Sequence, residues 1–169
     1  MTSCTELDAG SIPMQPIGHV RGGRTDPTDD FWGGATSRIE LARGIDPSSL
    51  DGIEEFSHVE VFFVFDKVDP SRAVAGTRRP RNNPEWPLVG VFAQRGKNRP
   101  NRLGATIVRV LAREGSELVV SELDAVDGTP VLDIKPVMRE FLPRGDVSQP
   151  EWSHEIMSSY WERPHGEGT

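Results

Sequence analysis

The 169-residue sequence has a single cysteine, Cys4, which excludes an internal disulfide. One cysteine and four scattered histidines give no ligand spacing of a structural zinc site, so we expect no bound metal. No apolar run approaches the roughly 20 residues that cross a bilayer, and the first residues lack a basic segment followed by an apolar one. We therefore expect a cytoplasmic protein without membrane attachment.

The sequence is also poor in positive charge overall, with a formal net charge of −7. The charges are unevenly distributed, however. Residues 72–113 contain ten cations and one acid, a charge of +9, whereas the remainder contains nine cations and 25 acids, a charge of −16. Such segregation is typical of a surface that binds a polyanion. Solvated surface arginines would give the same pattern, so the charges alone leave both interpretations open.

Short runs of β-branched and aromatic residues are the strongest secondary-structure signal. They predict strands at 15–21, 36–41, 58–65, 88–93, 105–113, 118–123 and 130–134, of which 88–93 is expected to be buried. Asp46 and Pro47 predict the start of one or two helical turns. Long polar loops are expected at 22–34 and 69–87. Many short strands with few helices predict a mainly β fold, either a barrel or a β-rich sheet.

One amphipathic helix is expected near the C-terminus, where Ser148 and Glu151 have the spacing of a capping box. Four apolar or aromatic residues follow at helical spacing, namely Trp152, Ile156, Met157 and Tyr160. We interpret this helix as a cover for the core rather than as a ligand site. Neither repeats nor a linker divide the chain, so we expect a flexible tail over 1–13 and a single domain over 14–169.

Three stretches carry residues that chemistry could use. The turn QRGKNRPNR at 94–102 crowds four cations together, which a surface turn does not require, so it indicates an anionic partner. Ser57 and His58 stand where the strand 58–65 begins. Asp124 and Asp127 flank a turn, where a carboxylate can accept hydrogen bonds from a ribose, orient a cation or act as a base. On spacing alone, a structural role is the better explanation of the last two groups.

Four segments taken together resemble a known family. They read PIGHVR at 16–21, GIEEFSHVEVFFVF at 52–65, GVFAQRGKNRPNRLG at 90–104 and LDAVDGTPVLDIKP at 123–136. In this order and at these separations, they are similar to the TrmO (YaeB/VirR-like) S-adenosylmethionine-dependent tRNA methyltransferases. The resemblance covers most of residues 14–138, and its RPN and LDxxDGTPVLDIKP elements are long and unusual.

This resemblance implies a small β-barrel methyltransferase that forms a homodimer and uses S-adenosylmethionine. It implies methylation of N6 of threonylcarbamoyladenosine, the modified base next to the anticodon of tRNA. Carried over residue by residue, the donor-binding positions are Ser57, His58, Arg95, Arg99, Asn101, Leu103, Asp124 and Asp127. A base near the acceptor nitrogen would assist the transfer, and the candidates, unranked, are Asp124, Asp127 and His58.

The basic segment, residues 72–113, supplies the expected contacts to tRNA phosphates. The residues that we expect to bind RNA are Arg78, Arg79, Arg81, Lys97 and Arg102.

The sequence departs from the family pattern at several positions, which are Asp66, Gly96, Lys97, Arg102, Leu103 and Val137. These departures leave two alternatives open. One is a related methyltransferase with a small-molecule acceptor, and the other is a non-catalytic module that binds the donor or RNA.

Overall fold

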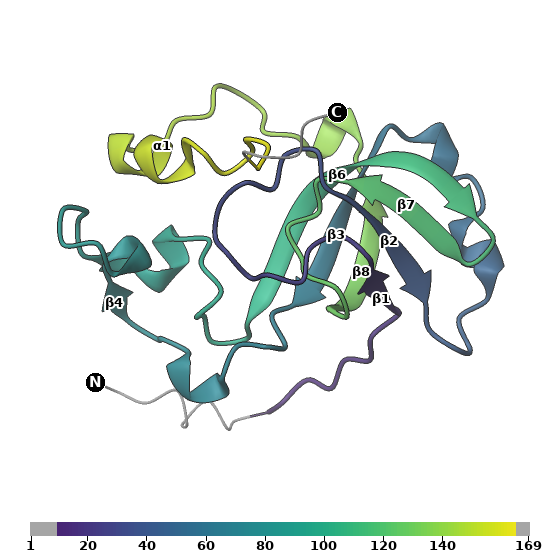
Figure 1. The fold of residues 1–169 in the computed structure, drawn as a ribbon, viewed down its shortest axis with the longest axis horizontal. Coiled ribbons are helices and arrows are strands. Elements are labelled where there is room, and N and C mark those ends of the chain that lie inside the picture. Colours follow the sequence, from purple (N-terminus) through teal and green to yellow (C-terminus); the bar gives the residue numbers. More distant parts are fainter. Residues whose placement is uncertain (1–9, 165–169) are drawn as a thin grey trace.

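Six antiparallel strands close into a barrel, which confirms the predicted mainly β fold (Figure 1). The computed structural model describes residues 10–164, so Cys4 and positions 1–9 of the predicted tail lie outside the described residues. The strands are β1 (Gly18–Arg21), β2 (Thr36–Leu41), β3 (His58–Val64), β6 (Leu103–Glu114), β7 (Glu117–Ser121) and β8 (Pro130–Pro136). Their order around the barrel is β1-β2-β7-β6-β3-β8, and β1 pairs with β8 to close it, with Gly18 opposite Val131.

Alternate residues of the strands fill the barrel. In β3, Val59, Val61 and Phe63 are buried while the residues between them are partly exposed, the two-residue period of a strand with one face on a core. The core continues across the neighbouring strands through Ile39 of β2 and Val108 of β6. Each such side chain contributes about 1.5–3 kcal/mol when it is fully buried. The predicted strands at 36–41, 58–65, 105–113, 118–123 and 130–134 are therefore confirmed, with shifts of a few residues at their ends.

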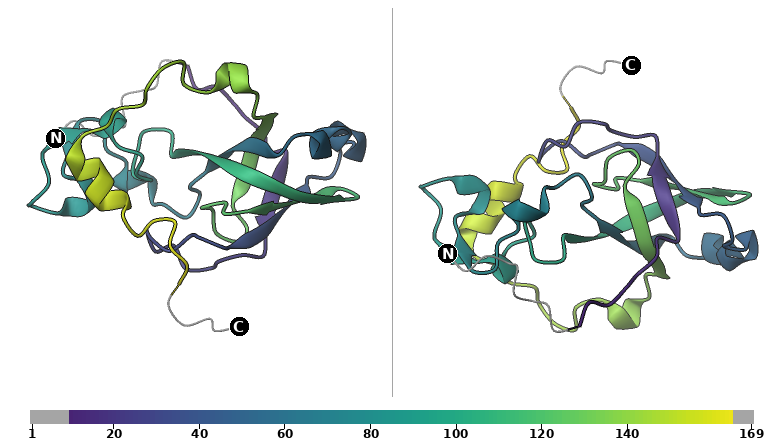
Figure 2. Two further views of the ribbon diagram at one scale, coloured as in Figure 1. Left: turned by 90° about the horizontal axis from the view of Figure 1, so that it is seen from above. Right: turned by 90° about the horizontal axis from the view of Figure 1, so that it is seen from below.

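A long insertion, residues 65–102, leaves the barrel between β3 and β6 and lies at one end of it (Figures 1 and 2). It contains five short elements: η4 (Pro70–Arg72), β4 (Thr77–Arg78), η5 (Pro80–Asn82), β5 (Val89–Gly90) and η6 (Val91–Ala93). The two-residue strands β4 and β5 pair only with each other. The loop predicted for 69–87 is thus confirmed in outline.

The buried strand predicted for 88–93 is wrong. Only two of its residues are extended, in β5, and Val91–Ala93 forms a 3₁₀ turn. Val91 is buried, but Leu88 and Phe92 are 59% and 79% exposed. A run of apolar residues becomes a buried strand only where a sheet offers a partner and a covered face, and this run lies outside the barrel.

The remaining 3₁₀ elements are η2 (Pro47–Leu50), η3 (Ile53–Glu55) and η7 (Arg139–Phe141). The predicted turn at Asp46 and Pro47 is confirmed, because an oxygen of the Asp46 side chain accepts the backbone N–H of Ser48 at 2.9 Å. That hydrogen bond lowers the pKa of Asp46, since it stabilises the carboxylate form.

The C-terminal helix α1 (Glu151–Met157) forms, but two expectations about it are wrong. Pro150 occupies the N-cap position and no side chain caps the helix there, so Ser148 lies two residues before the N-cap, too far out for a capping box. None of its residues is buried, so the helix does not cover the core. Instead it lies beside the long insertion, where Nε1 of Trp86 donates to the Glu155 carboxylate at 2.9 Å (Figures 1 and 2).

Among residues 10–164, no helix is both long enough and apolar enough to cross a membrane.

Candidate functional site

The end of the barrel that bears the long insertion brings most of the predicted site residues together. Val64, at the end of β3, pairs with Leu103, at the start of β6, so the Arg-rich turn at 94–102 emerges at this end. Within one chain, Ser57 and His58 lie away from this end of the barrel. His58 pairs with Arg109, six residues back along β3, or about 20 Å at the rise of a strand. There, Oγ of Ser57 and Nδ1 of His58 lie 2.7 Å apart.

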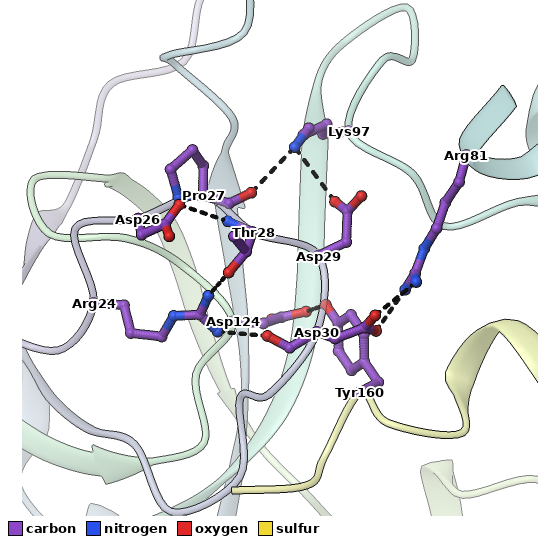
Figure 3. A network of polar contacts seen from close by, with 10 residues as sticks. All are labelled: Arg24, Asp26, Pro27, Thr28, Asp29, Asp30, Arg81, Lys97, Asp124 and Tyr160. Carbon is purple, nitrogen blue, oxygen red and sulfur yellow. Dashed lines mark hydrogen bonds and ion pairs between the residues drawn. The ribbon is translucent and has the colours of Figure 1, made fainter. Parts of the chain in front are cut away.

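Asp124 lies beside the first half of β6, which pairs with β3 on one edge but has no strand on the other. Strand β7 ends at Ser121, opposite Arg109, so it does not continue along the first residues of β6. Glu122 then adopts a positive φ of 61°, which turns the chain away from the sheet. Beyond this turn, Asp124 accepts hydrogen bonds on both carboxylate oxygens. One comes from Oγ1 of Thr106, and the other comes from the hydroxyl of Tyr160 (Figure 3). The carboxylate is therefore fixed in place by two donors.

Arg95 reaches the same stretch of β6. Its guanidinium donates to the backbone carbonyl of Ala105, the neighbour of Thr106. Its positive charge also acts on the phenol of Tyr160, where it partly opposes the effect of Asp124. The sequence expectation that Arg95 and Asp124 lie in one site is consistent with their contacts to two adjacent residues of β6, Ala105 and Thr106.

A pocket of about 650 Å³ opens beside the start of β6. Its lining is Ala75, Gly76, Gly90, Val91, Phe92, Arg99, Pro100, Asn101 and Leu103. Three of these, Arg99, Asn101 and Leu103, are positions predicted to bind the donor. The volume lies within the range of small-molecule sites, which combine apolar walls with a few polar groups. Nη1 of Arg99 donates to the Gln94 carbonyl at 3.0 Å, so this side chain also holds the shape of the Arg-rich turn.

Asp127 lies in the turn after Asp124 and ties three segments together. An oxygen of its side chain accepts the N–H of Gly22 at 2.9 Å, and its own N–H donates to the Arg24 carbonyl at 2.8 Å. Its carbonyl accepts from the Lys67 ammonium at 2.8 Å. These contacts join the loop after β1, the turn before β8 and the start of the long insertion. They place Asp127 at the same end of the barrel as Asp124.

An acidic loop, residues 26–30, faces the basic segment (Figure 3). Arg81 donates two hydrogen bonds to the Asp30 carboxylate, at 2.7 and 2.8 Å, and Lys97 lies 3.4 Å from Asp29. The hydrogen bond with Asp30 raises the pKa of Arg81 further above its ordinary value. Two cations that we expected to bind RNA are thus paired with acids of the same chain.

The other three expected RNA contacts also make internal hydrogen bonds. Arg78 donates to the Asn82 side chain at 2.9 Å, and Arg79 donates to the Trp86 carbonyl. Arg102 donates to the Val68 carbonyl at 2.9 Å. These three bonds go to uncharged oxygens, so the positive charges are not cancelled by an acid. Arg78, Arg79 and Arg102 are therefore better candidates for phosphate contacts than Arg81 and Lys97.

Sequence reasoning missed the two donors to Asp124, Thr106 and Tyr160, and the acids that pair with the cations, Asp29 and Asp30. No local signal identifies them, because all four contacts join residues far apart in the chain. The one available sign was compositional, since Tyr160 is the only tyrosine. Within residues 10–164, no group of three or more His, Cys, Asp or Glu residues is placed to hold a metal ion.

The arrangement supports binding more directly than proton transfer. A pocket with apolar walls and two polar side chains can hold a small molecule, and a fixed carboxylate can accept further hydrogen bonds on its remaining lone pairs. A general base, by contrast, must reach a substrate proton with an oxygen or nitrogen. Each oxygen of the Asp124 carboxylate already accepts one hydrogen bond.

Comparison with known proteins gives a consistent result. Residues 26–141 match the family model of the tRNA-methyltransferase O N-terminal domain. The chain is 34% identical over 152 residues to a human tRNA (adenine(37)-N6)-methyltransferase, covering 85% of this chain and 34% of that protein. It is also 34% identical over 140 residues to a probable S-adenosyl-L-methionine-binding protein of Pyrococcus abyssi, covering 80% of this chain and 73% of that protein.

Solved structures agree with the sequence comparison. A crystal structure of TrmO from Pseudomonas aeruginosa superposes with a TM-score of 0.69 at 28% identity, covering 87% of this chain and 64% of that one. The chain spans about a third of the length of the mammalian relatives that it matches.

Proposed function

Because the chain belongs to the TrmO family, as its match to the tRNA-methyltransferase O N-terminal domain shows, we propose that it is an S-adenosylmethionine-dependent tRNA methyltransferase. Its acceptor is N6 of an adenine next to the anticodon, the position in the names of the mammalian and Escherichia coli relatives. The resemblance in sequence further indicates threonylcarbamoyladenosine as the modified base.

One observation carries this proposal. Of the eight positions inferred to bind the donor, three line a single pocket and two more, Arg95 and Asp124, lie at the neighbouring stretch of β6. The pocket has the size of a small-molecule site and the apolar walls that would receive an adenine ring. Four of these residues come from the single stretch 95–103, and the fold adds Asp124, which follows β7, through its contact with Thr106 of β6.

The donor, when bound, supplies an activated methyl group on its sulfonium, so that the protein's task is alignment. The pocket residues bind the donor and orient it. Asp124, with its two donors, acts as a hydrogen-bond acceptor for the ligand rather than as the base. His58 lies at the far end of β3, away from the pocket. Of the three candidate bases, Asp127 therefore remains.

We also propose that the protein is a homodimer. Strand β6 exposes three large apolar residues on its outer face, Leu103, Ile107 and Leu111, at 42%, 49% and 48% exposure. Leu103 and Ile107 lie four residues apart on one side of the strand, and Leu111 follows at the register shift between Val110 and Ala112. A contiguous exposed apolar patch marks a protein–protein interaction site.

Two measurements test the function. Isothermal titration of the purified chain with S-adenosylmethionine should show binding at sub-millimolar donor, and Arg99→Ala should weaken it about tenfold or more. The matched control is Arg43→Ala, an exposed arginine in the loop after β2, which should bind like the parent. Circular dichroism must show that both variants fold. Absence of donor binding by the parent would refute the proposal.

The acceptor is tested by mass spectrometry of tRNA nucleosides after incubation with donor. Threonine tRNA that carries threonylcarbamoyladenosine should gain one methyl group, and the same tRNA without that modification should not. Donor binding without transfer to tRNA would favour the small-molecule methyltransferase or the non-catalytic module. The departures from the family pattern at Gly96 and Val137 are the observations that keep those alternatives in view.

A further inference from the structure

The segment that follows α1 contacts the candidate site through Tyr160 and Asp124. Its residues 159–162 lie alongside 31–33 and are fixed by three backbone hydrogen bonds of 2.8–3.1 Å, which run from Phe31, Trp32 and Gly33 to Ser159, Tyr160 and Glu162. This segment lies outside the matched family region, which ends at residue 141. A part of the chain that the family model does not include therefore contacts the site.

The docking of this segment depends on two glycines. A Cβ at Gly33 would lie 2.0 Å from the carbonyl oxygen of Trp161, so any other residue would displace the segment. Gly34 has a φ of +75°, and a Cβ there would lie 3.0 Å from Arg163. The loop at 31–34 is thus shaped to receive residues 159–163.

Docking delivers the Tyr160 side chain to Asp124 (Figure 3). The ring is largely buried and lies edge-on to Trp161, with centroids 4.9 Å apart, and its hydroxyl donates to Oδ2 of Asp124. Burial, followed by the negative charge of Asp124, raises the pKa of Tyr160 far above its ordinary value. The phenol therefore keeps its proton, and with it the ability to donate, at any pH at which the protein works.

We propose that Tyr160 is a positioning residue for the methyl-donor site, in which it holds the Asp124 carboxylate from the side opposite Thr106. Residues 159–162 thus add a contact to a site whose other residues lie within the matched family region. This inference rests on the proposed function, because Asp124 is assigned to the donor only there. Thr106 alone would leave Oδ2 of Asp124 without its donor and free to turn.

The test compares two variants that each remove one hydroxyl from the same segment. Tyr160→Phe keeps the ring and removes the donor to Asp124, and it should weaken S-adenosylmethionine binding about tenfold, as expected for loss of a hydrogen bond to a charged group. Ser159→Ala removes the neighbouring hydroxyl and should change binding less than twofold. In an Asp124→Ala background, which removes the acceptor, Tyr160→Phe should cause no further loss, because its effect passes through Asp124.

A spectroscopic readout tests the contact independently of any ligand. Tyr160 is the only tyrosine, so the tyrosinate absorbance near 295 nm reports on it alone. In the folded parent it should ionise well above pH 10, the ordinary range of a phenol, and Asp124→Asn should lower its pKa because the opposing negative charge is gone.

The outcomes separate the two proposals. If the parent binds no donor, the proposed function fails and this inference fails with it. If the parent binds donor and Tyr160→Phe binds it equally well or more tightly, only the positioning role is refuted. Ionisation of Tyr160 near pH 10 in the folded parent would show that the contact with Asp124 is not made, and would also refute it.

Discussion

Gly104 shows how much a single residue can decide in a small barrel. It is the second residue of β6 and lies opposite Phe63 of β3. A Cβ at this position would come within 2.4 Å of the Phe63 ring, which is 1% exposed and belongs to the core. The glycine therefore provides the space that the ring fills. It also closes the GVFAQRGKNRPNRLG motif, so packing and the candidate site meet at one residue.

We predict that Gly104→Ala destabilises the protein by about 1–3 kcal/mol, the usual cost of overpacking a core. The matched control is Gly96→Ala, in the same motif, where a Cβ would meet no atom within 4 Å and φ is not positive. Its free energy of unfolding should stay within about 0.5 kcal/mol of the parent. Urea denaturation measures both, and equal stability of the two variants would contradict the packing argument.

The residues of the candidate site were only partly predictable from the sequence. Motif resemblance pointed to Arg99, Asn101 and Leu103, which line one pocket. It grouped His58 with them, and within one chain His58 lies at the other end of β3, six residues from Val64. Tyr160 was read as part of a helix, which ends at Met157. Side-chain contacts between distant segments depend on the tertiary fold, and no local pattern encodes them.

At the scale of elements, β6 organises the molecule. It extends over 12 residues and pairs with β3 along its first half and with β7 along its second. Its inner residues reach the core, and its outer residues form the apolar row of Leu103, Ile107 and Leu111. One strand thus serves the barrel, the pocket and the proposed dimer interface.

If this row is the interface, charge within it should separate the subunits. We predict that the double variant Ile107→Glu, Leu111→Glu is monomeric, because two desolvated carboxylates would cost more than the apolar contact provides. Analytical ultracentrifugation should give twice the chain mass of 18.7 kDa for the parent and a single chain for the variant. Arg43→Glu, on an exposed loop, should remain dimeric. A parent that sediments as a single chain would refute the dimer.

Strands were predictable where a residue pattern and a tertiary partner agree. Residues 36–41 alternate and form β2 with the predicted bounds. Residues 88–93 are as apolar as a buried strand, yet they lie on the long insertion, where no sheet is available to cover them. The capping box failed for a local reason, since Pro150 takes the N-cap position and no side chain caps the helix. Composition predicts which segments can pair, and the topology decides which of them do.

At the scale of the whole molecule, the separation of charge in the sequence is reduced in space. The acidic loop at 26–30 pairs with Arg81 and Lys97, and Asp51 pairs with Arg113 at 2.6 Å. The segment with a formal charge of +9 therefore presents less positive charge than its composition indicates. The charges that remain on the long insertion include those of Arg78, Arg79, Arg95, Arg99 and Arg102, whose side chains donate hydrogen bonds to uncharged oxygens.

We predict that Arg78→Glu, Arg79→Glu weakens tRNA binding and makes its log–log salt dependence shallower by about two, because each lost phosphate contact removes about 0.9 from the slope. Donor affinity should stay within twofold of the parent, since neither residue lines the pocket. The control is Arg43→Glu, Arg139→Glu, which changes the charge equally at two exposed positions away from the insertion. Filter binding over a range of salt concentrations measures both, and identical curves would show that the insertion is an ordinary solvated surface.

The closure of the barrel by β1 and β8 also determines the order in which the protein can fold. Gly18 pairs with Val131, more than 110 residues away in the sequence, whereas β6 and β7 are joined by a two-residue turn. The β6–β7 hairpin can therefore form within microseconds, while closure must wait until most of the chain is available. On the ribosome, the edges of β1 and β2 stay unpaired until β7 and β8 have emerged. The barrel is thus a slow-folding structure with exposed edges for most of its synthesis.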